Sequence, residues 1–224
     1  MDYDAAPPFP LDQYRRVQLA IPGVEGMYRV ARAALEARLG PGARILVAGG
    51  GGGREVDALA PAEQGFRLDC VDPSAGMLAL TRQTAEGLGA EDRVALHRGL
   101  VSDLPREQLW DAATALLVMH FLPDDGAKLG FLLDLRARVA PGAPLLLADV
   151  CFAHPEERER LAPVFLRHAL LAGLTAEEAA LGTTMIRDMP IVSEDRTRAL
   201  LGEAGFLTVT PLFRGLWYAT WMAE

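Results

Sequence analysis

Lysine is almost absent from this sequence. Lys128 stands alone, so nearly all of the 22 Lys and Arg residues are arginine, and the formal net charge is −8. Arg15-Arg16 is the one adjacent basic pair, and no basic tract or stripe occurs. Nucleic-acid binding usually depends on clustered positive charge. A nucleic-acid partner is therefore disfavoured.

Cysteine, histidine and long apolar runs are also scarce. Cys70 and Cys151 lack C-x-x-C spacing, and the four histidines are too scattered to predict a metal site. So few cysteines suggest a reducing compartment. No apolar run reaches the roughly 20 residues that span a bilayer, and the acidic, proline-rich start MDYDAAPPFP is unlike a secretory leader. We expect a soluble, cytoplasmic protein without a membrane segment.

Short apolar runs alternate with helical patterns along the 224 residues, of which 50% are hydrophobic. This rhythm predicts one α/β domain with a parallel sheet and right-handed crossovers. We expect strands at 45–48, 66–71, 93–97, 111–119, 143–150, 207–213 and 216–222, and helices at 11–20, 24–39, 54–59, 75–87, 124–139, 156–172, 175–186 and 193–204.

The last third of the sequence departs from this alternation. Two consecutive helices follow the fifth strand, which predicts a helical cap over about 154–192. The last two strands are separated only by Arg214-Gly215, so they are expected to form an antiparallel hairpin. We divide the chain into an N-terminal arm with helices over the site, residues 1–40, and a ligand-binding domain, residues 41–224.

Five consecutive glycines, Gly49–Gly53, lie between the apolar run Ile45–Ala48 and the helix that begins at Arg54. A strand, a glycine loop and a helix in this order present bare backbone to a ligand. The dinucleotide pattern G-x-G-x-x-G fails in every register, and the phosphate-binding G-K-[ST] is absent. The run fits G-x-G-x-G at Gly49, Gly51 and Gly53, and a merely flexible turn is the alternative.

Polar residues at the ends of the predicted strands complete a candidate site, because ligands of open parallel sheets bind beyond these ends. Asp72 ends the second strand nineteen residues after Gly53, a separation from which an acid can bind both ribose hydroxyls. A charge at the start of the next helix is the alternative role. Met77 lies five residues further on and either covers a purine face or packs in the core.

His120 and Asp149 are the candidate catalytic residues. His120 lies just past the fourth strand and Asp149 lies at the end of the fifth. A neutral histidine near pH 7 can remove a proton from a hydroxyl or an amine. The alternatives are a histidine packed on the helix below and an aspartate that caps the next segment.

The ordered set LVAGGGGG, VDPSAGML, ALLVMHFL, PGAPLLLADV and a final AGF hairpin resembles the class I S-adenosylmethionine-dependent methyltransferases over roughly residues 41–224. The resemblance implies a Rossmann-like α/β fold, with a mostly parallel seven-stranded sheet, an antiparallel C-terminal hairpin and helices on both faces. It also implies S-adenosyl-L-methionine as the cofactor. The cofactor-binding residues implied are Gly49, Gly51, Gly53, Asp72, Pro73, Met77, Leu100, Val101, Leu116, Tyr14 and Arg15 or Arg16.

Three positions depart from that family's pattern. Val47 stands where many members have an acid in the first strand, and Leu100 stands where many have an acid after the third. Leu116 replaces a polar residue. Adenine would then be bound by backbone groups near Val101, or by Asp103.

A closer similarity is to the carboxy-S-adenosylmethionine synthases, in the opening RRVQLAIPGVEGM, the helical stretch after the fifth strand and the final FRGLWYATW. That subgroup holds a carboxymethyl group with the arginine and tyrosine of an R-A-N-G-Y stretch. Residues 170–174 here read LLAGL, so both polar side chains are missing. A carboxylate facing Leu170 and Leu174 would be unpaired. Ordinary S-adenosylmethionine is therefore expected.

The leading hypothesis is a methyltransferase that acts on a small-molecule acceptor through O, N or C, with a homodimer left open. Two alternatives use the same cofactor, namely a protein that binds it without catalysis and an enzyme that does not transfer methyl. A nicotinamide-dependent oxidoreductase is disfavoured because the third glycine of its fingerprint is missing.

Overall fold

The computed structural model describes Asp4 and residues 10–224, so residues 1–3 and 5–9 of the expected N-terminal arm lie outside the described residues. The helices are α1 (Tyr14–Val17), α2 (Val24–Arg38), α3 (Arg54–Leu59), α4 (Ala75–Leu88), α5 (Ala127–Arg136), α6 (Pro155–Leu171), α7 (Ala176–Asp188) and α8 (Glu194–Glu203). The strands are β1 (Arg44–Ala48), β2 (Arg67–Asp72), β3 (Val94–Arg98), β4 (Ala112–Leu116), β5 (Leu145–Val150), β6 (Val209–Gly215) and β7 (Tyr218–Ala223).

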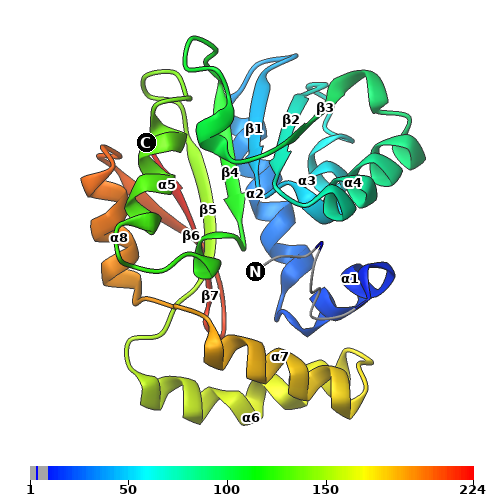
Figure 1. Ribbon diagram of the computed structural model, residues 1–224, viewed down its shortest axis with the longest axis vertical. Coiled ribbons are helices and arrows are strands. Elements are labelled where there is room, and N and C mark those ends of the chain that lie inside the picture. The colour runs from blue at the N-terminus through cyan, green and yellow to red at the C-terminus, as the bar shows by residue number, and fades with distance from the viewer. Residues whose placement is uncertain (1–3, 5–9) are drawn as a thin grey trace.

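The seven strands form one sheet in the order β3-β2-β1-β4-β5-β7-β6 (Figure 1). The first five strands are parallel, and β7 pairs antiparallel with both β5 and β6. The expected fold class is therefore confirmed. The strand order reverses between β1 and β4, which is where sheets of this kind bind their ligands.

Each face of the sheet is covered because strand side chains point alternately to opposite sides. Ile45 and Val47 of β1 belong to the apolar cluster formed with α2, α3 and α4. Leu46 and Ala48 belong to the opposite cluster, which includes residues of α5 and α8. Both faces of β1 are thus dry, as its unbroken apolar sequence predicts.

Among the expected boundaries that differ from the structure, two changes follow from leucines with positive φ. Leu117 has a φ of +65°, which ends β4 at Leu116 instead of the expected residue 119. Leu216 has a φ of +53°, and the hairpin turns at Leu216-Trp217 rather than at Arg214-Gly215. Gly215 lies inside β6, where a Cβ would come within 2.3 Å of the Pro22 carbonyl oxygen.

The helices α6 and α7, which we call the cap, lie across the end of the molecule where β5 ends (Figure 1). Phe165, Ala169 and Ile186 of the cap pack with Trp217 and Tyr218 of the closing hairpin in an apolar cluster. The cap therefore has a small core of its own, beside the carboxyl ends of the strands. Within the described part of the chain, no helix has the length and apolarity to cross a membrane.

Arg138 ties the end of α5 to the loop that follows β3. Its side chain is fully buried, and its Nη2 donates to the carbonyl oxygens of Ser102 at 2.7 Å and Leu104 at 2.9 Å. Its Nη1 donates to Asp134 Oδ1 at 3.0 Å. A buried guanidinium with several charge-assisted hydrogen bonds fixes the segments that it joins.

Replacing Arg138 with methionine is expected to lower the free energy of unfolding by about 3 kcal/mol, because the Ser102 and Leu104 carbonyls lose their charged donor. Urea unfolding followed by circular dichroism measures the change. Arg106→Met, at an exposed position of the same loop, is the control and should leave stability nearly unchanged. Equal stability of the two variants would show that Arg138 does not hold the loop.

Candidate functional site

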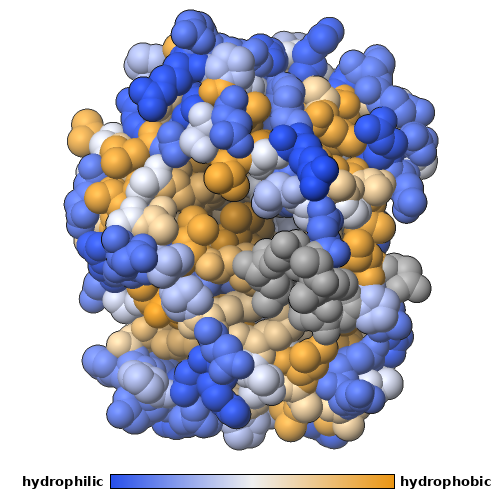
Figure 2. Space-filling view, in the orientation of Figure 1, coloured by the Kyte–Doolittle hydropathy of each residue, from blue (hydrophilic) through white to orange (hydrophobic). Residues whose placement is uncertain are grey.

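A cavity of about 520 Å³, which we call the large cavity, lies at the carboxyl ends of β1, β2 and β4. Figure 2 shows an apolar hollow at the centre of this face, between the sheet and the cap. Most of the predicted cofactor-binding residues line the large cavity, namely Tyr14, Gly49, Asp72, Pro73, Met77, Leu100, Val101 and Leu116. Residues far apart in the sequence thus form one site.

The glycine loop lies tightly beside β4 and beneath Tyr14. Gly49 has a φ of +66°, and a Cβ there would lie 2.3 Å from Val118 Cγ2. Gly52 has a φ of +79°, and a Cβ there would lie 2.1 Å from Tyr14 Cε1. No other residue fits these positions without displacing a neighbour. The close packing of Tyr14 on the loop therefore depends on glycine.

Gly51 and Gly53 do not line the large cavity. The Gly51 N–H donates to Asp72 Oδ2 at 3.1 Å, and a Cβ at Gly51 would lie 2.5 Å from Met77 Cβ. A Cβ at Gly53 would lie 2.4 Å from Thr84 Oγ1. Both glycines thus let the loop pack against β2 and α4. Their contact with a cofactor stays a prediction.

Asp72 is oriented by two backbone amides at the end of β2. Its Oδ2 accepts the hydrogen bond from Gly51, and its Oδ1 accepts one from the Ser74 N–H at 2.8 Å. Burial raises the pKa of Asp72, and the negative charge of Asp4 raises it further. Because each carboxylate oxygen can accept more than one hydrogen bond, Asp72 is held in place and can still bind ligand hydroxyls in the large cavity.

The loop after β3 presents Leu100, Val101 and Ser102 to the large cavity. Asp103 does not line it, because its Oδ2 accepts a hydrogen bond from the Leu100 N–H at 2.8 Å within the loop itself. The Leu100 side chain is 58% exposed. Of the two groups expected to bind adenine here, Val101 lies at the cavity and Asp103 is engaged elsewhere.

Glu55 is a candidate residue that the sequence analysis missed. It lies in the first turn of α3, lines the large cavity and is 3% exposed. Its Oε1 has no hydrogen-bond partner among the described residues. Burial raises the pKa of Glu55 to about 8. The signal in the sequence is its spacing, because Glu55 lies four residues before buried Leu59 on one face of α3.

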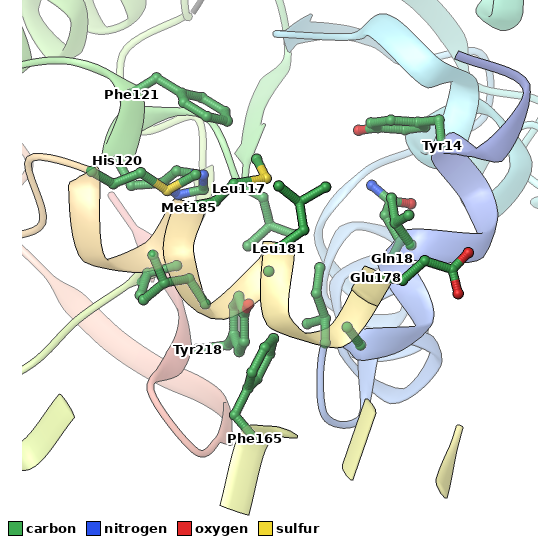
Figure 3. Close-up of a pocket in the computed structure, with 17 residues that line it drawn as sticks. Tyr14, Gln18, Leu117, His120, Phe121, Phe165, Glu178, Leu181, Met185 and Tyr218 are labelled. Atoms are coloured by element: carbon green, nitrogen blue, oxygen red, sulfur yellow. The ribbon is translucent and has the colours of Figure 1, made fainter. Parts of the chain in front are cut away.

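A second cavity of about 130 Å³, the small pocket, lies between the N-terminal segment, the cap and the ends of β4 and β5 (Figure 3). Its lining is mainly apolar. Tyr14, Leu117 and Phe121 line both the small pocket and the large cavity. These three residues therefore lie at the boundary where the two spaces adjoin, and Leu117 has a positive φ there.

His120 lines the small pocket and pairs with Asp149. His120 Nδ1 lies 2.5 Å from Asp149 Oδ1, which also accepts a hydrogen bond from the His120 N–H at 3.1 Å. Both side chains are buried. Because Asp149 engages Nδ1, Nε2 is the ring nitrogen left to exchange a proton with a ligand. The structure thus joins two residues that the sequence predicted separately.

Lys128, the single lysine, is fully buried near this pair and was also missed. Its Nζ donates to the carbonyl oxygen of Met119 at 2.7 Å, so it holds the short 3₁₀ turn Met119–Phe121 that carries His120. Burial lowers the pKa of Lys128, and the charge of Asp149 opposes that change. The lysine therefore supports the backbone beside His120.

Arg16 lies away from the large cavity. Its Nε lies 2.9 Å from Glu178 Oε1, and its Nη2 donates to the Gly173 carbonyl oxygen at 2.9 Å. Arg15 Nη2 donates to Thr84 Oγ1 at 3.0 Å. Arg16 thus fastens the N-terminal segment to the cap, and this ion pair lowers the pKa of Glu178 to about 2. A contact between Arg16 and a cofactor stays a prediction.

The stretch at residues 170–174, which is expected to lack the carboxymethyl-binding side chains, begins at the end of α6. Leu170 and Leu174 line neither the large cavity nor the small pocket. Leu171 is 73% exposed. The similarity to the carboxy-S-adenosylmethionine synthases stays a prediction.

Comparison with known proteins finds one matching family and several proteins of similar structure. Residues 46–145 match the family described as a methyltransferase domain, and a comparison with curated proteins found no match. An S-adenosylmethionine-dependent methyltransferase from Geobacter sulfurreducens in complex with S-adenosyl-L-homocysteine has a TM-score of 0.61 and 20% identity, over 93% of this chain and 74% of that one. An O-methyltransferase family 2 protein from Planctomyces limnophilus in complex with apigenin has a TM-score of 0.65 and 19% identity, over 96% and 60%. An O-methyltransferase family protein from Burkholderia thailandensis has a TM-score of 0.68 and 13% identity, over 96% and 59%.

The family match covers less than half of the chain, and the structural neighbours share little sequence with it. At such identities the structural likeness shows the fold, and the chain spans between 59% and 74% of the length of these three neighbours. The matched segment, residues 46–145, runs from β1 into β5 and includes the glycine loop and Asp72. Residues 46–145 thus match a methyltransferase domain, and the chain has the class I S-adenosylmethionine-dependent methyltransferase fold.

Stability of the ligand-free protein should depend on the Glu55 proton. The folded protein keeps this proton up to about pH 8, whereas an unperturbed glutamate loses it near 4.5. Between these two pH values the folded state binds more protons than the unfolded state. The free energy of unfolding therefore falls as pH rises from about 5 to 8. Glu55→Gln has no proton to lose, so its advantage over the wild type should grow over this range to on the order of 3 kcal/mol.

Urea unfolding at several pH values measures that difference. Glu91→Gln, at an exposed position, is the control and should follow the wild type. A difference between Glu55→Gln and wild type that stays constant with pH would show that Glu55 ionises normally.

Proposed function

We propose that this protein binds S-adenosylmethionine in the large cavity and methylates a small molecule held in the small pocket. One observation carries the proposal. The His120–Asp149 pair lies at an apolar pocket that adjoins, across Leu117 and Phe121, the cavity containing Asp72. This arrangement supports a base on the acceptor side of a site whose other side fits a nucleoside.

The residues of the large cavity fit the proposed cofactor. Asp72 offers an oriented carboxylate for the ribose hydroxyls, and Met77, Leu100 and Val101 offer apolar contacts for adenine. A volume of about 520 Å³ lies within the range of roughly 300–1,000 Å³ that is usual for such sites. When bound, S-adenosylmethionine supplies the methyl group on a sulfonium that leaves as a neutral thioether.

The chain's own residues position the acceptor and take its proton. His120 Nε2 accepts the proton of an acceptor hydroxyl or amine, and Asp149 orients the ring and stabilises its protonated form. Leu117 and Phe121 at the boundary keep water away from the reacting atoms. Phe165 and the other apolar residues that line the small pocket favour an acceptor with an apolar body.

Asp72→Ala should weaken binding of S-adenosylhomocysteine by about 1–3 kcal/mol, because the ribose loses a charge-assisted acceptor. Titration calorimetry measures the affinity, and NAD should give no heat with the wild type. Asp92→Ala is the control, because the Asp92 side chain is 83% exposed. Unchanged affinity in Asp72→Ala would remove Asp72 from the cofactor site.

His120→Ala should lower the rate of methyl transfer by about 10²–10⁴-fold, the usual contribution of a positioned base. The affinity for S-adenosylhomocysteine should stay nearly the same. Radiolabelled methyl transfer to a panel of apolar phenols and amines provides the assay, and exposed His154→Ala is the control. A wild-type protein that binds S-adenosylhomocysteine yet methylates nothing would favour a non-catalytic role, and equal rates in His120→Ala would dismiss His120 as the base.

A further inference from the structure

The function proposed above assigns no role to the carboxyl group of Glu55. Glu55 is 3% exposed, and its Oε1 has no hydrogen-bond partner among the described residues. Burying an unpaired carboxylate is costly, so such a group either keeps its proton or meets a cation. Because Glu55 lines the large cavity, a ligand in that cavity is able to supply the cation.

The groups around Glu55 make this part of the cavity receptive to positive charge. Glu55 interacts electrostatically with Tyr28 of α2, Asp72 of β2 and the buried thiol of Cys70. Arg54 is the neighbouring cation on α3. Its guanidinium pairs with Glu25 and lies 5.0 Å from the centre of the Tyr28 ring, and it forms no ion pair with Glu55 among the described residues.

Tyr14 is the other titratable group near this region, since it lines the same cavity and its charge acts on Tyr28. Apart from Arg54, the charged and titratable groups that face Glu55 are therefore carboxyls, phenols and a thiol. None of these supplies a positive charge. The charge of Arg54 acts on Glu55 without a direct ion pair between them, so a cation in direct contact with Glu55 has to arrive with the ligand.

We propose that Glu55 binds the positively charged amino group of the cofactor's amino acid tail, which rests on the function proposed above. S-adenosylmethionine carries two positive charges, on its sulfonium and on its ammonium. The sulfonium has no N–H and has to face the acceptor, whereas an ammonium offers three hydrogen-bond donors to a carboxylate. Glu55 therefore selects the amino acid tail rather than the methyl group.

Binding changes the protonation of Glu55. In the free protein the carboxyl group is protonated at pH 6.5, since burial raises the pKa of Glu55 to about 8. When the ammonium group enters, the carboxyl O–H bond breaks, its proton passes to the buffer, and the resulting carboxylate accepts an N–H from the ligand. Binding at pH 6.5 should thus release up to one proton per site, and less at higher pH.

The test compares two ligands that differ in the amino acid tail. S-adenosylhomocysteine has the tail and lacks the sulfonium, and 5′-methylthioadenosine lacks the tail. Both are titrated at pH 6.5 into wild type, Glu55→Gln and the exposed control Glu91→Gln, in two buffers of different ionisation enthalpy. We expect Glu55→Gln to bind S-adenosylhomocysteine about 10- to 100-fold more weakly and 5′-methylthioadenosine nearly unchanged, with proton release confined to S-adenosylhomocysteine on wild type and Glu91→Gln.

The outcomes separate this inference from the function on which it rests. If the wild type binds neither ligand, the proposed function fails and the role of Glu55 fails with it. If the wild type binds S-adenosylhomocysteine but Glu55→Gln binds it equally well and releases the same number of protons, only the role of Glu55 is overturned. Should Glu55→Gln not fold, the wild type still decides, because equal proton release with both ligands contradicts a role for the tail.

Discussion

The site depends on the close approach of side-chain-free backbone to its neighbours. A Cβ at Gly49, Gly51 or Gly52 would collide with Val118, with Met77 or with Tyr14. The loop can therefore lie flat against β2, α4 and the N-terminal segment at once. Packing at native density leaves no room for an added methylene here. The same approach lets the Gly51 amide reach Asp72, which fixes the carboxylate at the edge of the large cavity.

Buried charge beside the two cavities is only partly compensated. Asp149 satisfies His120 with one oxygen, and its other oxygen has no partner among the described residues. Glu55 Oε1 is in the same state. Lys128 and Arg138, the fully buried cations, both donate to backbone carbonyls of loops that border the cavities. These two buried cations therefore hold loops in place, whereas the acids Asp149 and Glu55 beside the cavities keep an oxygen without a partner among the described residues.

Much of the fold followed from the sequence because its signals are local. Alternating apolar runs and helical patterns gave the strand and helix order, and the glycine run gave the first crossover. The errors arose where a single residue takes a conformation that its type disfavours. Leu117 and Leu216 have positive φ, which moved the end of β4 and the hairpin turn. Propensity cannot foresee such residues, because surrounding packing imposes their conformation.

By itself, the sequence determined the parallel sheet, its antiparallel end, the cavity-lining Asp72 and Met77, and the identity of His120 and Asp149 as candidates. Only the tertiary structure decided that His120 and Asp149 pair, and that Glu55 turns into the large cavity. The sequence pattern shows where strands end. The packing of the layers, in contrast, fixes the pairing of two residues that lie twenty-nine apart and the direction of one helical side chain. Contacts across the fold have no periodicity along the chain, so the sequence pattern contains no record of them.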